Sequence, residues 1–375
     1  MRVLFVSDYF SQPNSGISRK MYLWNKYLPR VAPEVEFKVI SGDCPVGESD
    51  CRHVELQVRA PWTPFLHFVR SWRYWRAASA VYERWPYDII VFNDRFQAAA
   101  PLMFGLYGVR IAALINDDNY LRPRRRDRES LRNFLGRLAR SHAEKLIQRR
   151  VDLTIVCSKY LARQIHEARG GTLPSVLQPA LDREEFAQSI LPSQVKVQAN
   201  DQRLPSLLWL KAAAVRGGVF DILDALSDRE LAGRFAGLTI AGFDGPVRSE
   251  VERRGSDLGL AIRTLGPLSR KQVLQELVSH DIGVFASRQE AFGLGAREFA
   301  AAGMTVVASD AGGISEALEG LSAYRFRAKS VADLRRALGR AAGSPLTNSP
   351  DAALARDARD MTTELLELLS KTAAN

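Results

Sequence analysis

The chain has 375 residues, of which 46% are hydrophobic and 25% charged. These proportions exclude a disordered chain and predict a large buried core, and the length favours two domains. Three cysteines, Cys44, Cys51 and Cys157, form no CxxC pair, which argues against a disulfide framework and a cysteine zinc site and fits a reducing cytoplasm. No run reaches about 18 uninterrupted apolar residues, so we expect no membrane-spanning helix.

The formal net charge of +10 is concentrated in one half of the chain. Residues 1–190 contain 29 basic against 20 acidic residues, whereas the remainder contains 23 against 22. This asymmetry indicates that the first half meets an anionic partner: nucleic acid, a phosphorylated substrate or an acidic bilayer surface.

Short apolar runs alternate with helical stretches along both halves, the pattern of parallel sheets covered by helices on both faces. Strands are predicted at residues 3–7, 37–41, 88–93, 111–116 and 153–158 of the first half. In the second half, strands are predicted at 206–210, 238–241, 282–285 and 304–308, and helices at 218–226, 271–279 and 296–302.

The predicted organisation is a first Rossmann-like domain over 1–188, a linker over 189–204, a second such domain over 205–350 and a C-terminal helical segment over 351–375. Leu354, Met361, Leu365 and Leu368 have helical spacing, so we expect this segment to pack back on the first domain. Two doubly wound domains predict a cleft between them, with functional residues just after the strands.

The most informative stretch runs from Arg288 to Glu319 and places a glycine-bearing loop between a strand and a helix. Backbone N–H groups at Gly293, Leu294 and Gly295 could bind an anion, because a helix N-terminus leaves donors unpaired. Glu290 and Glu298 lie eight residues apart, and carboxylates accept hydrogen bonds from sugar hydroxyls. The alternative is that both carboxylates are solvated and the glycines only turn the chain.

This stretch resembles the Glu-x7-Glu signature of retaining glycosyltransferases of family 4, which have the GT-B fold. The resemblance extends over most of the second half, including the positions near Thr264. It implies that Glu298 binds the ribose of a nucleotide, that Glu290 holds the transferred sugar, and that Phe292, Gly293 and Leu294 lie under the diphosphate. The base contacts of this fold are largely main-chain, and by position Thr264 lies near the base.

The diphosphate leaving group needs positive charge, and Lys211 and Arg216 are the candidates. They follow the strand predicted at 206–210, where the family usually has Gly-Arg and then Lys-Gly. Here Leu210 replaces the glycine, and the lysine and arginine are exchanged. Since arginine forks onto two oxygens and lysine is a point charge, the geometry should differ from that of the family. The alternative is a pair of ordinary surface cations.

In the first half, Gly16 resembles the second glycine of the family's Gly-Gly loop and is expected near the phosphate; a plain turn glycine is the equal alternative. Asn116 lies where many relatives have histidine, so it can hydrogen-bond a sugar hydroxyl but cannot carry charge. Asp117 and Asp118 lack the spacing of a dedicated metal site, and the two cations make a divalent ion unnecessary. We therefore expect no metal and no cofactor besides the nucleotide-sugar substrate.

An aromatic, arginine-bearing segment extends from Pro61 to Trp85. Its helical face could lie in a bilayer interface with arginines on lipid phosphates, which predicts a peripheral membrane contact. The alternative, held equally, is a crossover helix with an ordinary core stripe. This face comprises Phe65, Phe68, Val69, Trp72, Trp75 and Tyr82.

These observations predict an α/β protein of the GT-B class that transfers a sugar, with retention and without metal, from a donor such as a UDP- or GDP-sugar. The expected acceptor is an anionic glycan or glycolipid in bacterial cell-surface synthesis, at the cytoplasmic face of the membrane. A catalytically inactive scaffold of the same fold is the first alternative. A basic nucleic-acid-binding protein is the second, and it is disfavoured because no RNP, KH or zinc signature is present.

Overall fold

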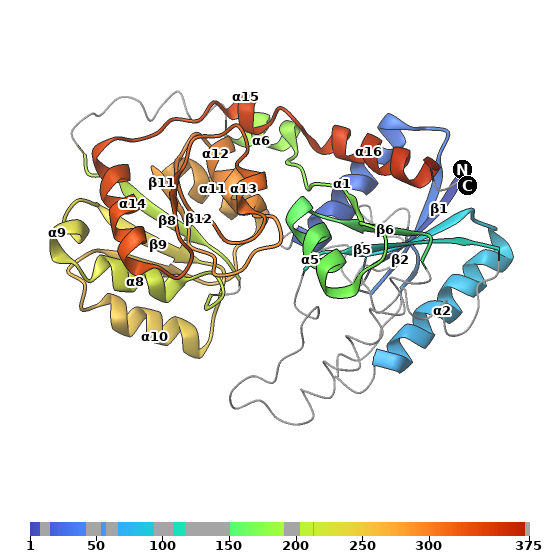
Figure 1. Cartoon of the computed structure of the whole chain (residues 1–375), viewed down its shortest axis with the longest axis horizontal. Coiled ribbons are helices and arrows are strands. Elements are labelled where there is room, and N and C mark those ends of the chain that lie inside the picture. Colours follow the sequence, from blue (N-terminus) through green and yellow to red (C-terminus); the bar gives the residue numbers. More distant parts are fainter. Residues whose placement is uncertain are drawn as a thin grey trace. The chain divides into compact units, whose positions relative to one another are not determined.

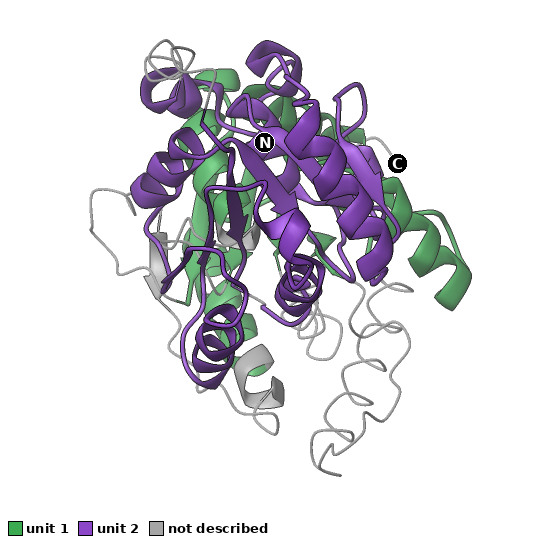
Figure 2. Ribbon diagram, turned by 90° about the vertical axis from the view of Figure 1, so that its left-hand side faces the viewer, with its two compact units in different colours: residues 1–179, 358–375 green, residues 180–357 purple. Residues whose placement is uncertain are grey.

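The computed structural model describes residues 1–7, 16–42, 54–57, 67–93, 108–117, 151–190, 203–212 and 214–371 (Figure 1). Its contacts divide the chain into two compact units (Figure 2). Unit 1 comprises Met1–Pro179 and Ala358–Asn375, and unit 2 comprises Ala180–Asp357. Most of the expected linker, residues 191–202, lies outside the described residues. Residues 180–188, which the sequence analysis assigned to the first domain, are part of unit 2.

Unit 1 contains a parallel sheet with the strand order β3-β2-β1-β4-β5-β6-β7. The order changes direction between β1 and β4, as in doubly wound folds. The strands are β1 (Arg2–Ser7), β2 (Glu36–Ser41), β3 (Val54–Gln57), β4 (Ile89–Phe92), β5 (Arg110–Ile115), β6 (Leu153–Val156) and β7 (Ser175–Val176). Its described helices are α1 (Gly16–Val31), α2 (His67–Arg84), α5 (Lys159–Arg169) and α16 (Ala358–Lys371).

Helix α2 packs on this sheet through small and aromatic residues. Tyr74, Ala78 and Val81 are fully buried against the core side chains of β1 and β4, whereas Trp72 is 37% exposed. Of the aromatic face expected from the sequence, Tyr82 packs against this core, whereas Trp72 lies at the surface. The proposed bilayer contact remains a prediction, and its first residues, 61–66, lie outside the described part of the chain.

Unit 2 contains a second parallel sheet with the order β10-β9-β8-β11-β12-β13, which reverses direction between β8 and β11. Its strands are β8 (Ser206–Leu210), β9 (Gly237–Ala241), β10 (Ile262–Leu265), β11 (Ile282–Phe285), β12 (Thr305–Ser309) and β13 (Tyr324–Phe326). Its helices are α6 (Arg183–Ser189), α8 (Val219–Leu226), α9 (Arg229–Ala232), α10 (Pro246–Gly255), α11 (Arg270–Ser279), α12 (Leu294–Ala301), α13 (Ile314–Ala317), α14 (Val331–Gly343) and α15 (Pro350–Ala353).

Both faces of the second sheet are covered, because side chains alternate along each strand. Leu207 and Trp209 point into a core completed by α8 and α14, while Leu208 lies in a second core with residues of α6, α12 and α15. Because these strands are buried on both faces, they appear in the sequence as continuous apolar runs without alternating polar residues. The predicted α/β class with two doubly wound sheets is confirmed.

The C-terminal segment is not one helix, as the spacing of its leucines suggested. Helix α15 ends at Ala353 and α16 begins at Ala358. Leu354 is buried in the core of unit 2, whereas Met361 and Leu365 are buried within unit 1, where α16 contacts α1. Arg359 of α16 also lies 5.7 Å from the ring centroid of Tyr27. The helical repeat therefore crosses the boundary between two cores, which spacing alone does not reveal.

Candidate functional site

The reversal of strand order in unit 2 brings the ends of β8 and β11 side by side. Lys211 directly follows β8, and Ser287 comes two residues after β11. In open α/β sheets, ligands bind outside the carboxyl ends of the strands at this reversal point. Backbone approaches are close here: a Cβ on Gly242, after β9, would lie 2.8 Å from the carbonyl carbon of Lys211.

Lys211 and Glu290, predicted separately from the sequence, form an ion pair. The Lys211 Nζ also donates to Ser287 Oγ at 2.9 Å and lies 4.7 Å from the centroid of the Phe285 ring. Ser287 in turn donates to Glu290 at 3.2 Å. Both charged side chains are about one-fifth exposed, at 20% and 21%, so an anionic or hydroxylated ligand could reach them.

The loop that follows Glu290 is held by backbone contacts. The N–H of Gly313 donates to the Glu290 carbonyl at 3.1 Å, and a Cβ on Gly313 would lie only 2.2 Å from the Ala291 carbonyl oxygen. Gly293 has φ 104° and caps the N-terminus of α12, while Phe292 is buried. Since the first turn of a helix leaves N–H donors without intrahelical partners, Gly293 and Leu294 lie at a terminus suited to an anion.

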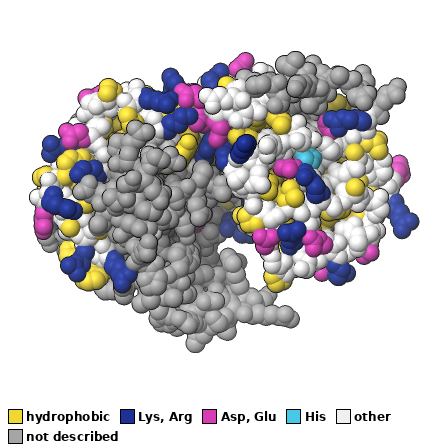
Figure 3. All heavy atoms as spheres, turned by 180° about the vertical axis from the view of Figure 1, so that it is seen from behind, with side chains coloured by type: hydrophobic (Ala, Val, Ile, Leu, Met, Phe, Trp, Pro, Cys, Tyr) yellow, Lys and Arg dark blue, Asp and Glu magenta, His cyan; other side chains and the backbone are white. Residues whose placement is uncertain are grey.

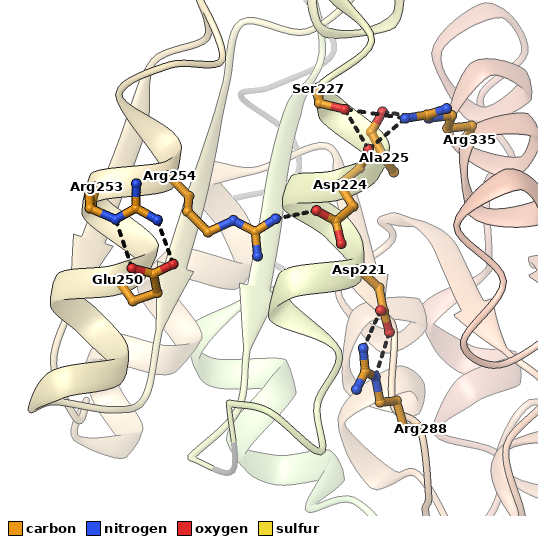
Figure 4. A network of polar contacts seen from close by, with 9 residues as sticks. All are labelled: Asp221, Asp224, Ala225, Ser227, Glu250, Arg253, Arg254, Arg288 and Arg335. Carbon is orange, nitrogen blue, oxygen red and sulfur yellow. Dashed lines mark hydrogen bonds and ion pairs between the residues drawn. The ribbon is translucent and has the colours of Figure 1, made fainter.

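Arg216 is not brought into the Lys211–Glu290 cluster. Its side chain is exposed, and no ion pair to it is found among the described residues. Its carbonyl accepts from the Arg288 N–H at 2.8 Å, which ties the turn after β8 to the loop after β11. Arg288 in turn binds Asp221 of α8 through two nitrogens (Figure 4), and these hydrogen bonds raise the pKa of Arg288.

Glu298 binds a basic residue that the sequence analysis did not single out. Its Oε1 accepts from Arg270 at the start of α11, and Arg270 also donates to Glu185 of α6. Burial by itself would lower the pKa of Arg270, but Glu298 and Glu185 outweigh it, so that pKa is raised. Ser269 and Gln272 form a capping box that marks the start of α11, but nothing in the local sequence indicates that Arg270 pairs with Glu298.

Thr264 lies in β10, and its hydroxyl donates to Glu252 of α10. Its carbonyl accepts from Arg248 at 3.3 Å. The hydroxyl and the carbonyl of Thr264 are therefore both bonded to side chains of α10 in this structure. Its expected place near a nucleotide base remains a prediction.

In unit 1, Asn116 follows β5 and lies in a polar cluster at the ends of the central strands. Its Oδ1 accepts from the amine of Lys20 on α1, and its Nδ2 donates to Oδ1 of Asn93 at 3.3 Å. Asn93 follows β4 and donates to Ser7 at 3.2 Å. Gly16 is the first residue of α1. Asp118 lies outside the described residues.

Lys20 was not identified from the sequence. It is 5% exposed, and burial lowers the pKa of its amine, with a smaller opposing effect from Cys157. A lysine in the first turns of an amphipathic helix normally indicates a solvated face, so nothing in the local pattern indicated this position.

Two protein-family models together match most of the chain. Residues 16–185 match the model described as Glycosyltransferase Family 4, and residues 207–343 match the model described as Glycosyl transferases group 1. Both halves are glycosyltransferase domains. The second of these domains contains Lys211, Glu290 and Glu298.

Solved structures of similar fold extend over nearly the whole chain. The structure of Alr3699/HepE of Anabaena in complex with UDP has 19% identity and a TM-score of 0.69, and covers 99% of this chain and 100% of that one. A sucrose-phosphate synthase of Thermosynechococcus elongatus has 15% identity and a TM-score of 0.70, covering 100% and 98%. WaaG, a glycosyltransferase involved in lipopolysaccharide biosynthesis, has 17% identity and a TM-score of 0.68, covering 99% and 100%. These likenesses show that the two glycosyltransferase domains have the GT-B fold.

A search of curated proteins gave no match. Among the described helices, none combines the length and the apolar character needed to cross a bilayer. Within the described residues, no group of three or more His, Cys, Asp or Glu side chains is arranged to hold a metal ion. In the face shown in Figure 3, the basic and acidic side chains of the described surface are interspersed.

Proposed function

We propose that this glycosyltransferase moves a sugar from a nucleotide-diphosphate donor to an acceptor hydroxyl with retention at the anomeric carbon and without a metal ion. The observation that carries the proposal is the cluster of Lys211, Ser287 and Glu290 beside the glycine-capped start of α12. It puts a cation, a carboxylate and helix N–H donors at the reversal point of one sheet, where a sugar diphosphate needs them.

In this proposal each group takes a separate part of the donor. The Lys211 amine and the first-turn N–H groups after Gly293 bind the diphosphate, Glu290 accepts from hydroxyls of the sugar, and Glu298 accepts from the ribose. Lys211 and Glu290 neutralise each other in the absence of ligand. When the donor binds, the amine turns to the phosphate, and the carboxylate accepts from the sugar.

The chemical step needs no protein nucleophile. The bond between the anomeric carbon and the phosphate oxygen breaks, and the acceptor oxygen bonds to the same face of that carbon. The acceptor proton passes to the departing phosphate, whose growing negative charge is stabilised by Lys211. Arg216, which is exposed on the preceding turn, is the second cation proposed for the phosphates.

We propose that unit 1 receives the acceptor. Asn116, held between Lys20 and Asn93, would bind a hydroxyl, and Gly16 would approach the phosphate. The basic excess of residues 1–190 favours an anionic acceptor, such as a polyprenyl-diphosphate-linked glycan or a lipid A core, at the cytoplasmic face of a bacterial membrane. WaaG, a structure of similar fold, is described as a glycosyltransferase involved in lipopolysaccharide biosynthesis, which is in keeping with this class of acceptor.

The test is a survey of UDP-, GDP- and ADP-sugars with the purified protein, measuring donor hydrolysis and the anomeric configuration of the released sugar by NMR. We expect one donor to be turned over with its configuration kept. Lys211→Met should lower kcat by about 100-fold, and Glu298→Ala should raise the donor KM by about tenfold or more. Glu250→Gln, on the exposed face of α10, is the matched control. If the protein binds a nucleotide but turns over no donor with any extract that contains acceptors, the result would instead favour the alternative of a catalytically inactive scaffold.

A further inference from the structure

The side chain of Glu298 belongs to a buried ionic cluster with Arg270 and Glu185, which come from three different helices of unit 2. We propose that Arg270, held in place by Glu185, is a positioning residue that keeps one oxygen of Glu298 fixed and leaves the other free for ribose hydroxyls. This inference rests on the proposed function, because it takes Glu298 as the residue that binds the ribose.

The guanidinium of Arg270 is oriented by contacts on two of its edges and on one of its faces. Its Nε and Nη2 donate to Oε2 of Glu185 at 3.1 and 2.8 Å, while Nη1 donates to Oε1 of Glu298. The guanidinium carbon also lies 5.7 Å from the ring centroid of Phe186, which is fully buried. Glu185 is therefore bound through the Nε and Nη2 edge, and Glu298 through Nη1.

This division of contacts determines what Glu298 can still do. Among the described residues, its Oε2 makes no hydrogen bond, whereas Oε1 is occupied by Arg270. The Glu298 side chain is 18% exposed, and that of Arg270 is 14% exposed. The free oxygen can therefore accept from a ligand hydroxyl, and the fixed oxygen keeps the carboxylate in one orientation before the ligand arrives.

In this proposal, Glu185 does more than anchor Arg270. It keeps Arg270 from binding both oxygens of Glu298. A glutamine at position 185 would accept only through a neutral amide oxygen, so Arg270 would be drawn to Glu298 as its remaining charged partner and would bind both of its oxygens, the geometry that arginine and carboxylate prefer. Glu185→Gln should then weaken binding of the ribose hydroxyls although Glu298 and Arg270 are both intact.

The experiment measures, by calorimetry, the Kd of UDP, GDP and ADP and of their 2′,3′-dideoxy counterparts. For the nucleotide that the wild-type chain binds best, we expect the dideoxy compound to bind at least about tenfold more weakly. It lacks the ribose hydroxyls that donate to the Glu298 carboxylate. Glu185→Gln and Arg270→Lys should each reduce the ratio of the dideoxy Kd to the ribonucleotide Kd several-fold, because each weakens binding of the ribonucleotide alone. Arg253→Met, which removes an exposed ion pair with Glu250 (Figure 4), should leave the ratio unchanged.

The outcomes separate the two claims. A wild-type chain that binds none of the three nucleotides contradicts the proposed function. A wild-type chain that binds and discriminates, with Glu185→Gln and Arg270→Lys keeping the full ratio, overturns the positioning role alone. Both variants retain the shape of the side chain or its charge, and a thermal melt of each confirms that a lost ratio is not lost folding.

Discussion

Lys20 is a buried amine that donates to the side-chain oxygen of Asn116, and its burial has consequences for stability. Burial lowers its pKa below the ordinary value of 10.5. Between the lowered value and 10.5, the unfolded chain binds more protons than the folded chain. Stability contributed by this residue therefore rises with pH across that interval.

The Lys20→Met variant has no such titration. We expect the difference in free energy of unfolding, wild type minus variant, to increase as pH rises towards 10.5. Urea unfolding of both proteins at several pH values from neutral upwards measures it, and the other titrating groups cancel in the difference. A difference that stays constant over this pH range for Lys20→Met would contradict the effect of burial.

Within the candidate site, the sequence pattern singles out Glu290, Gly293 and Glu298 because they lie on one strand-loop-helix segment. Their binding roles remain predictions. The partners of Glu298 could not be predicted, because Arg270 and Glu185 are 28 and 113 residues away along the chain, and their pairing depends on how α6 and α11 pack. Likewise, the contact between Lys211 and Glu290 follows from the reversed strand order, which residue spacing does not contain.

At the scale of elements, the turn that joins β8 to α8 depends on close backbone packing. Gly218 has φ 75°, and a Cβ there would lie 2.0 Å from the carbonyl oxygen of Ala286 at the end of β11. Gly320 has a similar φ of 72° but has nothing within 4 Å of its Cβ position. A substitution at either glycine would strain the backbone, but only a substitution at Gly218 would also clash with Ala286.

Gly320→Ala should cost about 1 kcal/mol in stability, the usual penalty of a left-handed alanine. Gly218→Ala should cost clearly more and should also weaken nucleotide binding, because Ala286 precedes Ser287 of the site. Chemical denaturation and calorimetry of both variants test this. Equal losses in the two variants would show that the contact with Ala286 does not matter.

Element prediction succeeded where strands are buried on both faces and failed at the sheet edges. The predicted strands at 206–210 and 282–285 agree with β8 and β11, since continuous apolar runs leave no other interpretation. Strands β3, β7, β10 and β13 were not predicted. They are two to four residues long and carry polar side chains such as Arg263 and Arg325, so they lack the apolar pattern of a central strand.

At the scale of the whole molecule, the chain leaves unit 1, builds unit 2 and returns to complete unit 1 with α16. Leu365 of α16 is fully buried, whereas the neighbouring Leu366 is half-buried. Helix α16 should therefore contribute to the stability of the first unit and not of the second.

Leu365→Ala should lower the stability of unit 1 by about 2–5 kcal/mol, the usual cost of removing a fully buried leucine side chain, and Leu366→Ala should cost less. Hydrogen exchange reports the two units separately. We expect faster exchange in β1, β4 and β5 of the Leu365 variant and unchanged protection in β8, β11 and β12. Equal loss of protection in both sheets would mean that the units unfold as one.

The central claim is that unit 2 binds a sugar nucleotide through Lys211, Glu290 and Glu298, and a crystal structure with the nucleoside diphosphate that binds best tests it most directly. The account predicts phosphate oxygens within hydrogen-bond distance of the Lys211 amine and the first N–H groups of α12, with ribose hydroxyls on Glu298. A nucleotide bound elsewhere, with Lys211 still paired to Glu290 and Glu298 bound only to Arg270, would contradict it.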